Sequence, residues 1–418
     1  MRSSDLGRYA LGVCATAMLA SCGGASGTPL SPSPAGVTAE RTHVRPAYRV
    51  LYSFAGGSRD GDYPEAELIN VNGTLYGTTE GGGGDCSSSG GCGTVFTVTT
   101  AGKEHVLHAF RGTDGEKPCA GLTNVDGTLY GTTLGGGAND YGTVFSITAD
   151  GKERTLYSFK GGSDGEYSSA RLASVHGELY GTTGFGGSGS GSECYPEGCG
   201  TVFEVSVSGV ERVLYNFIGG SDGANPSAGL INVDGTLYGT TFAGGFGSGG
   251  SNIGTVFSIT TAGNERVLYN FKGMFGDGAN PNAGLTSVNG TLYGTTTVGG
   301  DGGHGTVFSV TTAGQEHVLH DFKGKRDGSN PFDHLAKLNG ALYGVTYNGG
   351  SYSDGAVFSI ATSGAESVLY SFKGAADGAE PWAGLTDVKG TLYGTTERGG
   401  GTGCSNHQGC GTVFSLSP

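Results

Sequence analysis

The chain has 418 residues, of which 86 are glycine, and 23 Lys and Arg residues against 37 Asp and Glu residues give a net charge of −14. Scattered cations on an acidic chain exclude nucleic acid as a main partner, because a polyanion needs clustered positive charge. Charged residues make up 14% of the chain and aromatic residues 10%. This composition excludes a disordered acidic tail and is compatible with a packed core.

Residues 1–21 have the pattern of an export signal. Arg2 and Arg8 precede an apolar run over residues 9–20, which is too short to span a bilayer. The run leads into Leu19-Ala20-Ser21-Cys22, which resembles the lipobox of bacterial lipoproteins. The resemblance implies cleavage before Cys22 and acylation of Cys22, and several acyl chains anchor a protein stably. An ordinary secretory signal, cleaved without lipidation, is the alternative.

The position after Cys22 is Gly23, not the Asp that retains similar lipoproteins at the inner membrane. The resemblance therefore implies an exported bacterial lipoprotein at the outer membrane or cell surface, with the membrane as a partner through the lipid. Residues 22–47 are rich in Gly and Pro without an apolar period, and we predict a lipidated Cys followed by a flexible tether.

Residues 48–418 consist of seven repeats, each marked by three phrases. The phrase Gly-x-Leu-Tyr-Gly-x-Thr begins at Gly73, Gly127, Gly177, Gly235, Gly290, Gly340 and Gly390. The phrase Gly-(Thr/Ala)-Val-Phe begins at Gly93, Gly142, Gly200, Gly254, Gly305, Gly355 and Gly411. The third phrase, as in Val50-Leu51-Tyr52-Ser53-Phe54, ends at Phe54, Phe110, Phe159, Phe217, Phe271, Phe322 and Phe372.

Each phrase is a short run of residues that favour β-strands, and a fourth run such as residues 120–125 precedes each Leu-Tyr-Gly phrase. Asn72-Gly73 and Asp126-Gly127 supply the positive φ angles of two-residue hairpins. We predict an all-β, seven-bladed β-propeller with four antiparallel strands per blade. A β-helix is the alternative, although its coils take fewer residues than these repeats.

The order of the phrases predicts how the ring closes. The strand over residues 48–54 opens the domain without its three partners, and the phrase at residues 411–414 closes the chain without a fourth strand. We therefore expect the N-terminal strand to complete the C-terminal blade, which also removes an open sheet edge.

These phrases resemble the GloVer tandem repeat of exported bacterial proteins described as "choice-of-anchor". The resemblance covers residues 48–418 and rests on Gly-Thr-Leu-Tyr-Gly-Thr-Thr, Gly-Thr-Val-Phe-Ser and Val-Leu-Tyr-Ser-Phe-x-Gly. It implies a surface protein whose anchor varies among relatives. It implies no catalytic residue.

Variable segments fall on one face, formed by the Gly-rich loops between second and third strands and by the crossings between blades. Variable loops on a rigid scaffold are where binding usually resides. Three cysteine pairs lie in these loops, and export favours local disulfides over zinc sites: Cys86 with Cys92, Cys194 with Cys199, and Cys404 with Cys410. Cys119 is left over and is expected to be buried.

Two recurrent motifs favour structural roles. An Asp-Gly pair recurs in all seven crossings, at Asp60, Asp114, Asp164, Asp222, Asp277, Asp327 and Asp377, where Asp is expected to form turns rather than bind cations. His105 and His108, like His317 and His320, are three apart on a strand and face opposite sides, so neither pair chelates one ion. We predict no metal and no cofactor.

Departures from the repeat at the start of the innermost strand are more informative. Pro-x-Ala-Gly-Leu is usual, but blades one, three, six and seven replace it with Glu65, Glu67, Arg171, Phe332, Asp333, His334 and Trp382. Blades six, seven and one are neighbours in the closed ring. We expect these side chains to converge at the upper mouth of the channel, where an aromatic side chain could stack on a sugar and carboxylates could bind its hydroxyls. Drift among channel-lining residues that contact no ligand is the alternative.

The favoured hypothesis is a monomeric, lipid-anchored, non-enzymatic module that binds a glycan or an envelope protein through its upper face. An enzyme that cleaves polysaccharide with Asp333 or a Glu and His334 as acid and base is the second hypothesis. A structural scaffold in the envelope is the third. Fold alone does not choose among them.

Overall fold

A computed structural model describes residues 46–84, 86, 90–189, 194, 197–245, 253–273, 276–401, 403–404 and 408–418. Arg45–Pro418 form one compact unit. The predicted signal, Cys22 and nearly all of the predicted tether lie outside the described residues. Within the described part of the chain, no helix has the length and apolarity needed to cross a membrane.

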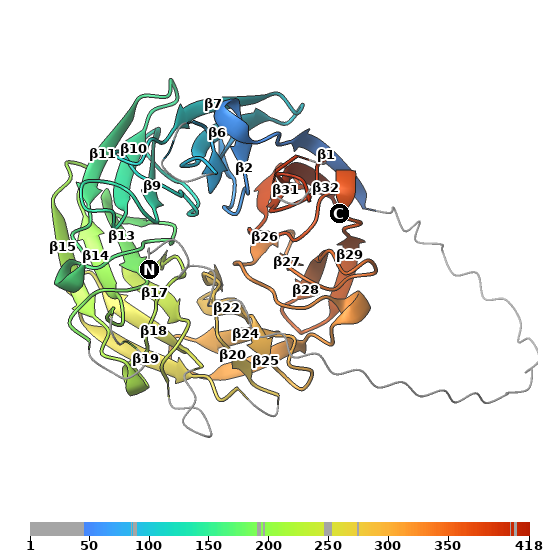
Figure 1. Ribbon diagram of the computed structural model, residues 1–418. Coiled ribbons are helices and arrows are strands. Elements are labelled where there is room, and N and C mark those ends of the chain that lie inside the picture. The colour runs from blue at the N-terminus through green and yellow to red at the C-terminus, as the bar shows by residue number, and fades with distance from the viewer. Residues whose placement is uncertain are drawn as a thin grey trace, which may run out of the picture. The chain divides into compact units, whose positions relative to one another are not determined.

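The compact unit is a seven-bladed β-propeller, which confirms the predicted fold (Figure 1). Every blade is a four-stranded antiparallel sheet, with its first strand at the centre of the ring and its fourth at the rim. Blades 1 to 3 comprise β3 (Ile69–Val71), β4 (Thr74–Thr79), β6 (Thr94–Thr99) and β7 (Glu104–Ala109); β8 (Thr123–Val125), β9 (Thr128–Thr133), β10 (Thr143–Ile147) and β11 (Glu153–Ser158); and β12 (Ala173–Val175), β13 (Glu178–Thr183), β14 (Thr201–Val205) and β15 (Glu211–Asn216). Blades 4 and 5 comprise β16 (Ile231–Val233), β17 (Thr236–Thr241), β18 (Thr255–Thr260) and β19 (Glu265–Asn270); and β21 (Thr286–Val288), β22 (Thr291–Thr296), β24 (Thr306–Thr311) and β25 (Glu316–Asp321). Blades 6 and 7 comprise β26 (Ala336–Leu338), β27 (Ala341–Thr346), β28 (Ala356–Ala361) and β29 (Glu366–Ser371); and β30 (Thr386–Val388), β31 (Thr391–Thr396), β32 (Thr412–Ser417) and β1 (Ala47–Ser53).

The residues that recur in every repeat explain the hairpins and the packing of each blade. Asn72 and Gly73 have φ angles of 52° and 89°, so they form the predicted two-residue hairpin between β3 and β4. The glycine of the Leu-Tyr-Gly phrase is required by packing, because a Cβ on Gly77 would lie 2.7 Å from both Leu68 and Phe96. Phe96 is fully buried and meets Phe54 of the neighbouring blade edge-on, with ring centroids 5.0 Å apart. The same phenylalanine contact recurs at the other six blade interfaces.

The ring closes as predicted, through the N-terminal strand. β1 pairs antiparallel with β32, with Tyr48 opposite Leu416 and Ser53 opposite Thr412. Tyr48 also stacks on Tyr370 of blade 6, with ring centroids 3.9 Å apart. The closing strand therefore holds blade 7 to blade 6 as well as completing its sheet.

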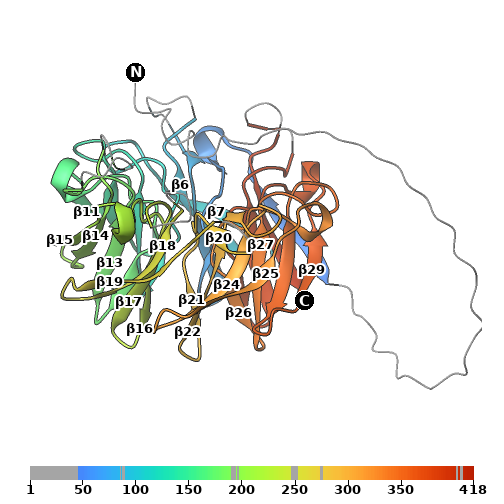
Figure 2. The same ribbon diagram turned by 90° about the horizontal axis from the view of Figure 1, so that it is seen from below.

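The crossings and the loops between second and third strands lie on the face opposite the two-residue hairpins (Figure 2). Each crossing aspartate accepts a backbone N–H of its own turn, as Asp222 does from Ile218 at 2.8 Å. Several of these aspartates lie in or beside a short 3₁₀ helix: η2 (Gly57–Arg59), η3 (Gly162–Asp164), η5 (Gly220–Asp222), η6 (Lys325–Asp327) and η7 (Ala375–Asp377). All seven crossings also pair with the loop of the following blade. Two do so through short strands, β2 (Gly61–Asp62) with β5 (Gly81–Gly82) and β20 (Gly278–Ala279) with β23 (Val298–Gly299), and five through a single β-bridge, as between Glu116 and Gly135. These contacts favour the turn-forming role of Asp.

The three predicted disulfides are present in the loops of this upper face. Cys86–Cys92, Cys194–Cys199 and Cys404–Cys410 have Cα–Cα distances of 5.7, 4.6 and 5.3 Å. Each closes a short loop. In the chain-entropy model, such a crosslink stabilises a fold by about 2 kcal/mol because it constrains the unfolded chain. Cys119 has a free thiol and is half-buried rather than buried, because it lies in the channel wall near the mouth.

Candidate functional site

Three alternate positions, two residues apart, line the approach to each innermost strand, and the repeat gives each position seven equivalents. The outer register, just before the proline or its equivalent, comprises Tyr63, Lys117, Tyr167, Asn225, Asn280, Asn330 and Glu380. The middle register comprises Glu65, Cys119, Ser169, Ser227, Asn282, Phe332 and Trp382. The inner register comprises Glu67, Gly121, Arg171, Gly229, Gly284, His334 and Gly384.

The charged side chains of the inner register form one network around Glu67. Arg171 Nη1 lies 2.6 Å from Glu67 Oε2, and His334 Nε2 lies 3.1 Å from Glu67 Oε1. His334 Nδ1 lies 3.0 Å from Asp333 Oδ1, and Asp333 Oδ2 accepts the backbone N–H of Gly384 at 2.6 Å. The structure thus brings together four of the residues that the sequence placed at the channel.

One glycine makes room for the network, in which Arg171 and His334 each reach across an intervening blade. A Cβ on Gly384 of blade 7 would lie 2.7 Å from His334 Cε1, which is too close. A Cβ on Gly121 of blade 2 would lie 3.5 Å from Arg171 Cδ, which is an ordinary van der Waals contact. His334 of blade 6 therefore meets Glu67 of blade 1 across a position that requires glycine, whereas Arg171 of blade 3 passes a position with room for a small side chain.

The network fixes the charges of its members. Burial opposes ionisation of His334, but Glu67 and Asp333 outweigh it and hold the pKa of the imidazole well above its usual value. Burial likewise opposes ionisation of Glu67, yet His334 and Arg171 hold the pKa of that carboxyl below its usual range. Asp333 behaves in the same way, with His334 lowering its pKa against the effect of burial. Glu67 and Asp333 are thus already paired carboxylates.

Aromatic side chains gather in the middle register of blades 6 and 7. The rings of Phe332 and Trp382 stack with centroids 4.3 Å apart and an interplanar angle of 9°. Tyr347, which follows β27, lies perpendicular to both rings and donates its hydroxyl to Glu380 Oε2 at 2.7 Å. Phe332 is buried while Trp382 keeps part of its surface exposed, so Trp382 is the member that a ligand can contact.

A second group of carboxylates lies beside these rings. Burial, with Glu80 and Glu397 as neighbours, raises the pKa of Glu65 well above its usual value. Burial also raises the pKa of Glu397 to about 7, although Arg398 opposes the rise. Lys117 Nζ lies 3.0 Å from Glu80 Oε1, and Arg398 Nε lies 3.1 Å from Glu380 Oε2. Glu65 is therefore a carboxyl whose ionisation is disfavoured by its surroundings, and it lies among charges that are already paired.

The thiol of Cys119 belongs to the same wall. Burial, with Glu80 and Glu65 nearby, raises its pKa well above the usual value for cysteine. A protonated thiol is neither a nucleophile nor a good metal ligand. Cys119 therefore contributes a small apolar group to the site.

In the outer register, three blades have Asn and four neighbouring blades depart from it. All seven residues have left-handed backbone, with φ between 53° and 57°. Asn tolerates this conformation, and Asn225, Asn280 and Asn330 also donate to carbonyls of the preceding blade at 2.8 to 3.0 Å. Blades 7, 1, 2 and 3 have Glu380, Tyr63, Lys117 and Tyr167 instead, without that tolerance. Strain kept at such positions is typical of functional sites.

The sequence predicted the channel residues but not their division into two groups. Glu67, Arg171, Asp333 and His334 form the inner network, whereas Phe332, Trp382 and Glu65 lie one register further out. The sequence analysis did not predict Glu80, Glu397 and Tyr347, because these residues follow the second strand and not the innermost one. They occupy equivalent positions just after the second strand, where blades 2 to 5 have Leu134, Gly184, Phe242 and Thr297. The same comparison at that position identifies them.

Clusters of side chains that could hold a metal lie on the outer rim rather than at the mouth, within the described residues. His108, Asp114 and Glu153 form one, and His320, Asp327 and Glu366 form the other. The predicted separation of the histidine pairs is consistent with this arrangement, since His105 and His317 are exposed while His108 and His320 are half-buried.

The chain is a seven-bladed propeller in which one part of the channel mouth departs from the repeat, and comparison with known proteins gives its family. The chain matches the Gloeobacter/Verrucomicrobia repeat over residues 24–195, 84–273 and 191–414, and it belongs to that family. No curated protein matches the chain.

Solved structures resemble this fold at low identity. The PQQ-bound aldose sugar dehydrogenase from Streptomyces coelicolor is 14% identical, with a TM-score of 0.45 over 89% of this chain and 98% of that one. The gluconolactonase XC5397 from Xanthomonas campestris is 13% identical, with a TM-score of 0.40 over 69% of this chain and 82% of that one. The tricorn protease is 9% identical, with a TM-score of 0.44 over 80% of this chain and 27% of that one. At these TM-scores none of the three informs the function of this chain.

Proposed function

We propose that the protein is a non-enzymatic binding module that holds a glycan at the upper mouth of its channel. The observation that carries this proposal is the concentration of aromatic and carboxyl side chains in one half of the mouth. Blades 6, 7, 1 and 2 supply Phe332, Trp382, Glu65 and Lys117, whereas blades 4 and 5 keep Asn, small polar residues and Gly. Drift would distribute departures around the whole ring.

The chemistry of this half-ring suits a polyhydroxylated ligand. The part of Trp382 that stays exposed supplies apolar surface that packs against sugar C–H groups, and the carboxyl of Glu65, with its raised pKa, is a hydrogen-bonding group for sugar hydroxyls. Ser169, Ser227 and Asn282 provide hydroxyl and amide groups across the mouth. The net charge of −14 disfavours acidic polysaccharides. A neutral or amino-sugar glycan is therefore the expected ligand.

Fluorescence of Trp382, the single tryptophan, tests the proposal. Titration of the purified protein with neutral, amino-sugar and acidic oligosaccharides is expected to give a saturable change in emission with the first two classes. Glu65→Gln keeps the shape of the site but alters its donors, and we expect roughly tenfold weaker binding, as for loss of one hydrogen bond. Tyr352→Ala removes a rim aromatic that is 56% exposed and serves as the control. No saturable change with any oligosaccharide contradicts the proposal and favours a scaffold.

An enzymatic function is the second candidate, and one observation favours it. Glu65 has the raised pKa of a general acid and lies beside the carboxylates of Glu80 and Glu397, a pairing used in glycoside cleavage. His334, named from the sequence as an acid or base, is instead paired with Glu67 and Asp333, which raise its pKa well above the usual value. Release of reducing ends from a bound oligosaccharide, lost in Glu65→Gln while binding persists, establishes the enzyme. Binding without release establishes the module.

We further propose that the protein is exported and anchored through lipid on Cys22, at the outer membrane or cell surface. The lipobox-like Leu19-Ala20-Ser21-Cys22 supports the anchor, and three disulfides in the propeller support an oxidising compartment. Metabolic labelling with a palmitate analogue is expected to label the protein in the membrane fraction. Cys22→Ser is expected to abolish labelling, and the control Cys14→Ser to leave it unchanged. Equal labelling of both variants contradicts the anchor.

A further inference from the structure

The outer rim of the propeller repeats one arrangement between neighbouring blades. A crossing aspartate lies between a ring side chain on the outer strand of one blade and a glutamate on the outer strand of the next. Four interfaces use tyrosine: Tyr52, Asp60 and Glu104; Tyr157, Asp164 and Glu211; Tyr215, Asp222 and Glu265; Tyr269, Asp277 and Glu316. At the seventh interface, Tyr48 takes the place of the glutamate beside Tyr370 and Asp377.

Tyrosine satisfies this arrangement as a neutral donor. The Tyr215 hydroxyl donates to Asp222 at 2.6 Å, and burial with both carboxylates nearby raises the pKa of the phenol. A phenol that stays protonated is a poor metal ligand. These four interfaces are therefore held by hydrogen bonds.

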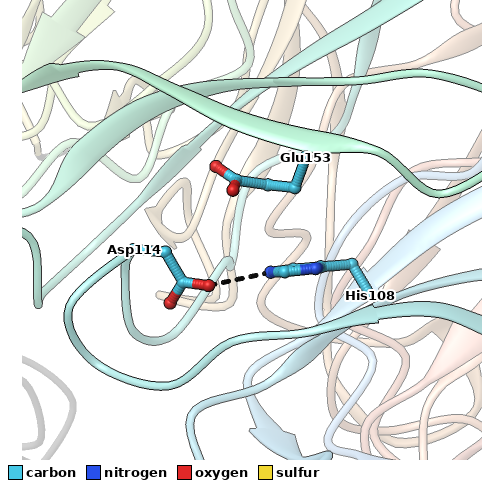
Figure 3. Close-up of side chains that lie close together, drawn as sticks. All are labelled: His108, Asp114 and Glu153. Carbon is cyan, nitrogen blue, oxygen red and sulfur yellow. Dashed lines mark hydrogen bonds and ion pairs between the residues drawn. The ribbon is translucent and has the colours of Figure 1, made fainter.

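Two interfaces have histidine in place of tyrosine, within the repeated pentapeptide Glu-His-Val-Leu-His of β7 and β25. His108 Nε2 lies 3.0 Å from Asp114 Oδ2, and the Glu153 carboxylate of β11 faces them from the next blade (Figure 3). His320 Nε2 lies 3.3 Å from Asp327 Oδ2, with Glu366 of β29 alongside. In each cluster the potential ligand atoms lie within 4.8 Å of one another.

The glutamate leaves a polar atom without a partner at most of these interfaces. Glu366 Oε1 is buried and accepts no hydrogen bond from the described residues, and the same holds for Glu104, Glu211, Glu265 and Glu316 at the tyrosine interfaces. In the second cluster the carboxylates of Asp327 and Glu366 lie close together and repel each other unless a cation or a proton lies between them. Histidine adds a nitrogen lone pair aimed at the same point. The cluster thus offers both the charge and the third ligand that a metal ion needs.

We propose that His108, Asp114 and Glu153, and likewise His320, Asp327 and Glu366, each bind one divalent transition-metal ion of the Zn²⁺ type. One imidazole nitrogen and two carboxylates suit Zn²⁺ or Mn²⁺, whereas Ca²⁺ prefers oxygen ligands alone. The ligands of each site come from two blades, so each ion joins blade 1 to blade 2 or blade 5 to blade 6. The alternative is that histidine replaces tyrosine only as a hydrogen-bond donor.

Metal content of the purified full-length protein tests the proposal. After equilibration with Zn²⁺ and removal of loosely bound ion, the protein is expected to retain two Zn²⁺ per chain. His108→Tyr and His320→Tyr are each expected to retain one, and the double variant none. These substitutions recreate the arrangement of the four tyrosine interfaces, so the fold is expected to persist. His105→Tyr and His317→Tyr alter exposed neighbours on the same strands and are expected to retain two.

A gain of binding provides the converse test. Tyr215→His places histidine beside Asp222 and Glu265 and is expected to raise the content to three Zn²⁺ per chain. Zn²⁺ is also expected to raise the unfolding temperature of the unaltered protein and not that of the double variant, since only the folded state assembles the ligands. Equal Zn²⁺ content in the unaltered protein and the double variant overturns the proposal, as does full displacement of Zn²⁺ by equimolar Ca²⁺.

Discussion

At the scale of single residues, three blades have a charged side chain in the inner register, where the other four have glycine. Glu67, Arg171 and His334 replace glycine in the inner register, and the glycine that remains at position 384 leaves room for the ring of His334. A buried ion pair contributes little net stability over an apolar pair but is expensive to break. The network therefore fixes the relative positions of blades 1, 3 and 6 more than it stabilises the fold.

Removal of the imidazole tests this view. Replacing His334 with Gln is expected to lower the free energy of unfolding by about 2–3 kcal/mol, because Glu67 keeps Arg171 but Asp333 loses its charged partner. The folded pKa of His334 is raised, so its contribution is complete below about pH 6.5, the unfolded pKa, and is lost as pH rises through the folded pKa. Denaturant unfolding of both proteins across pH 5 to 10 measures the difference.

On the acid side of the profile, the stability that the carboxylates contribute changes with pH in the opposite direction. Glu67 and Asp333 have lowered folded pKa values, so their contribution is present above their unfolded pKa values and is lost as pH falls through the folded ones. The difference between the two proteins is thus expected to peak in mildly acidic solution. His105→Gln, on an exposed strand position, is the control and should show no such profile. A pH-independent difference contradicts the ionic account.

At the scale of the strand, the blades are nearly identical, and the exceptions are instructive. Six blades join the second strand to the third through two buried threonine hydroxyls 2.8 to 2.9 Å apart. In blade 6 the third strand begins with Ala356, and the buried hydroxyl of Thr346 has no partner among the described residues. A buried hydroxyl without a partner destabilises a fold.

Ala356→Thr restores the missing partner and is expected to stabilise the protein by about 1 kcal/mol, the usual net value of one hydrogen bond. Thermal and denaturant unfolding measure the change. The reverse substitution at an equivalent position, Thr306→Ala, is expected to destabilise by a similar amount. Destabilisation by Ala356→Thr contradicts the equivalence of the blades, since it means that blade 6 lacks room for the added atoms.

Sequence-based prediction succeeds for the strands and hairpins of each blade, but it does not extend to contacts between side chains of different blades. Phrases such as Thr74–Thr79 repeat because every blade packs in the same way, so the strands and hairpins follow from one copy, and ring closure follows from the order of the phrases at the two ends of the chain. The contact of Arg171 with Glu67 follows from no single copy, because it depends on which blades lie near one another in the ring. The His108 cluster was missed for the same reason: Glu153 comes from the next blade.

At the scale of the whole molecule, closure through β1 and β32 determines whether the ring holds together. β1 supplies the outer edge of blade 7, and Tyr48 packs against Tyr370, Phe372 and Phe414. Without this strand, β32 presents an unpaired edge, which promotes association between chains.

Deletion of residues 46–54 is expected to lower the unfolding temperature markedly and to produce soluble aggregates, because blade 7 loses a strand and blade 6 loses the Tyr48 contact. Differential scanning calorimetry and light scattering measure both effects. Deletion of residues 1–45 is the control and is expected to leave the unfolding temperature unchanged, since the compact unit begins at Arg45. A monomeric, equally stable product of the first deletion contradicts the closing role of β1.

The pairing of β1 with β32 also sets an order of events during biosynthesis. Six blades can form one after another as the chain emerges, since each consists of consecutive residues, but β1 is made first and must wait for β32, made last. Joining segments so far apart requires closing nearly the whole chain into a loop, which slows the final step. Until then Tyr48 lacks its partners Tyr370, Phe372 and Phe414, so the unfinished ring is the form in greatest need of protection by chaperones.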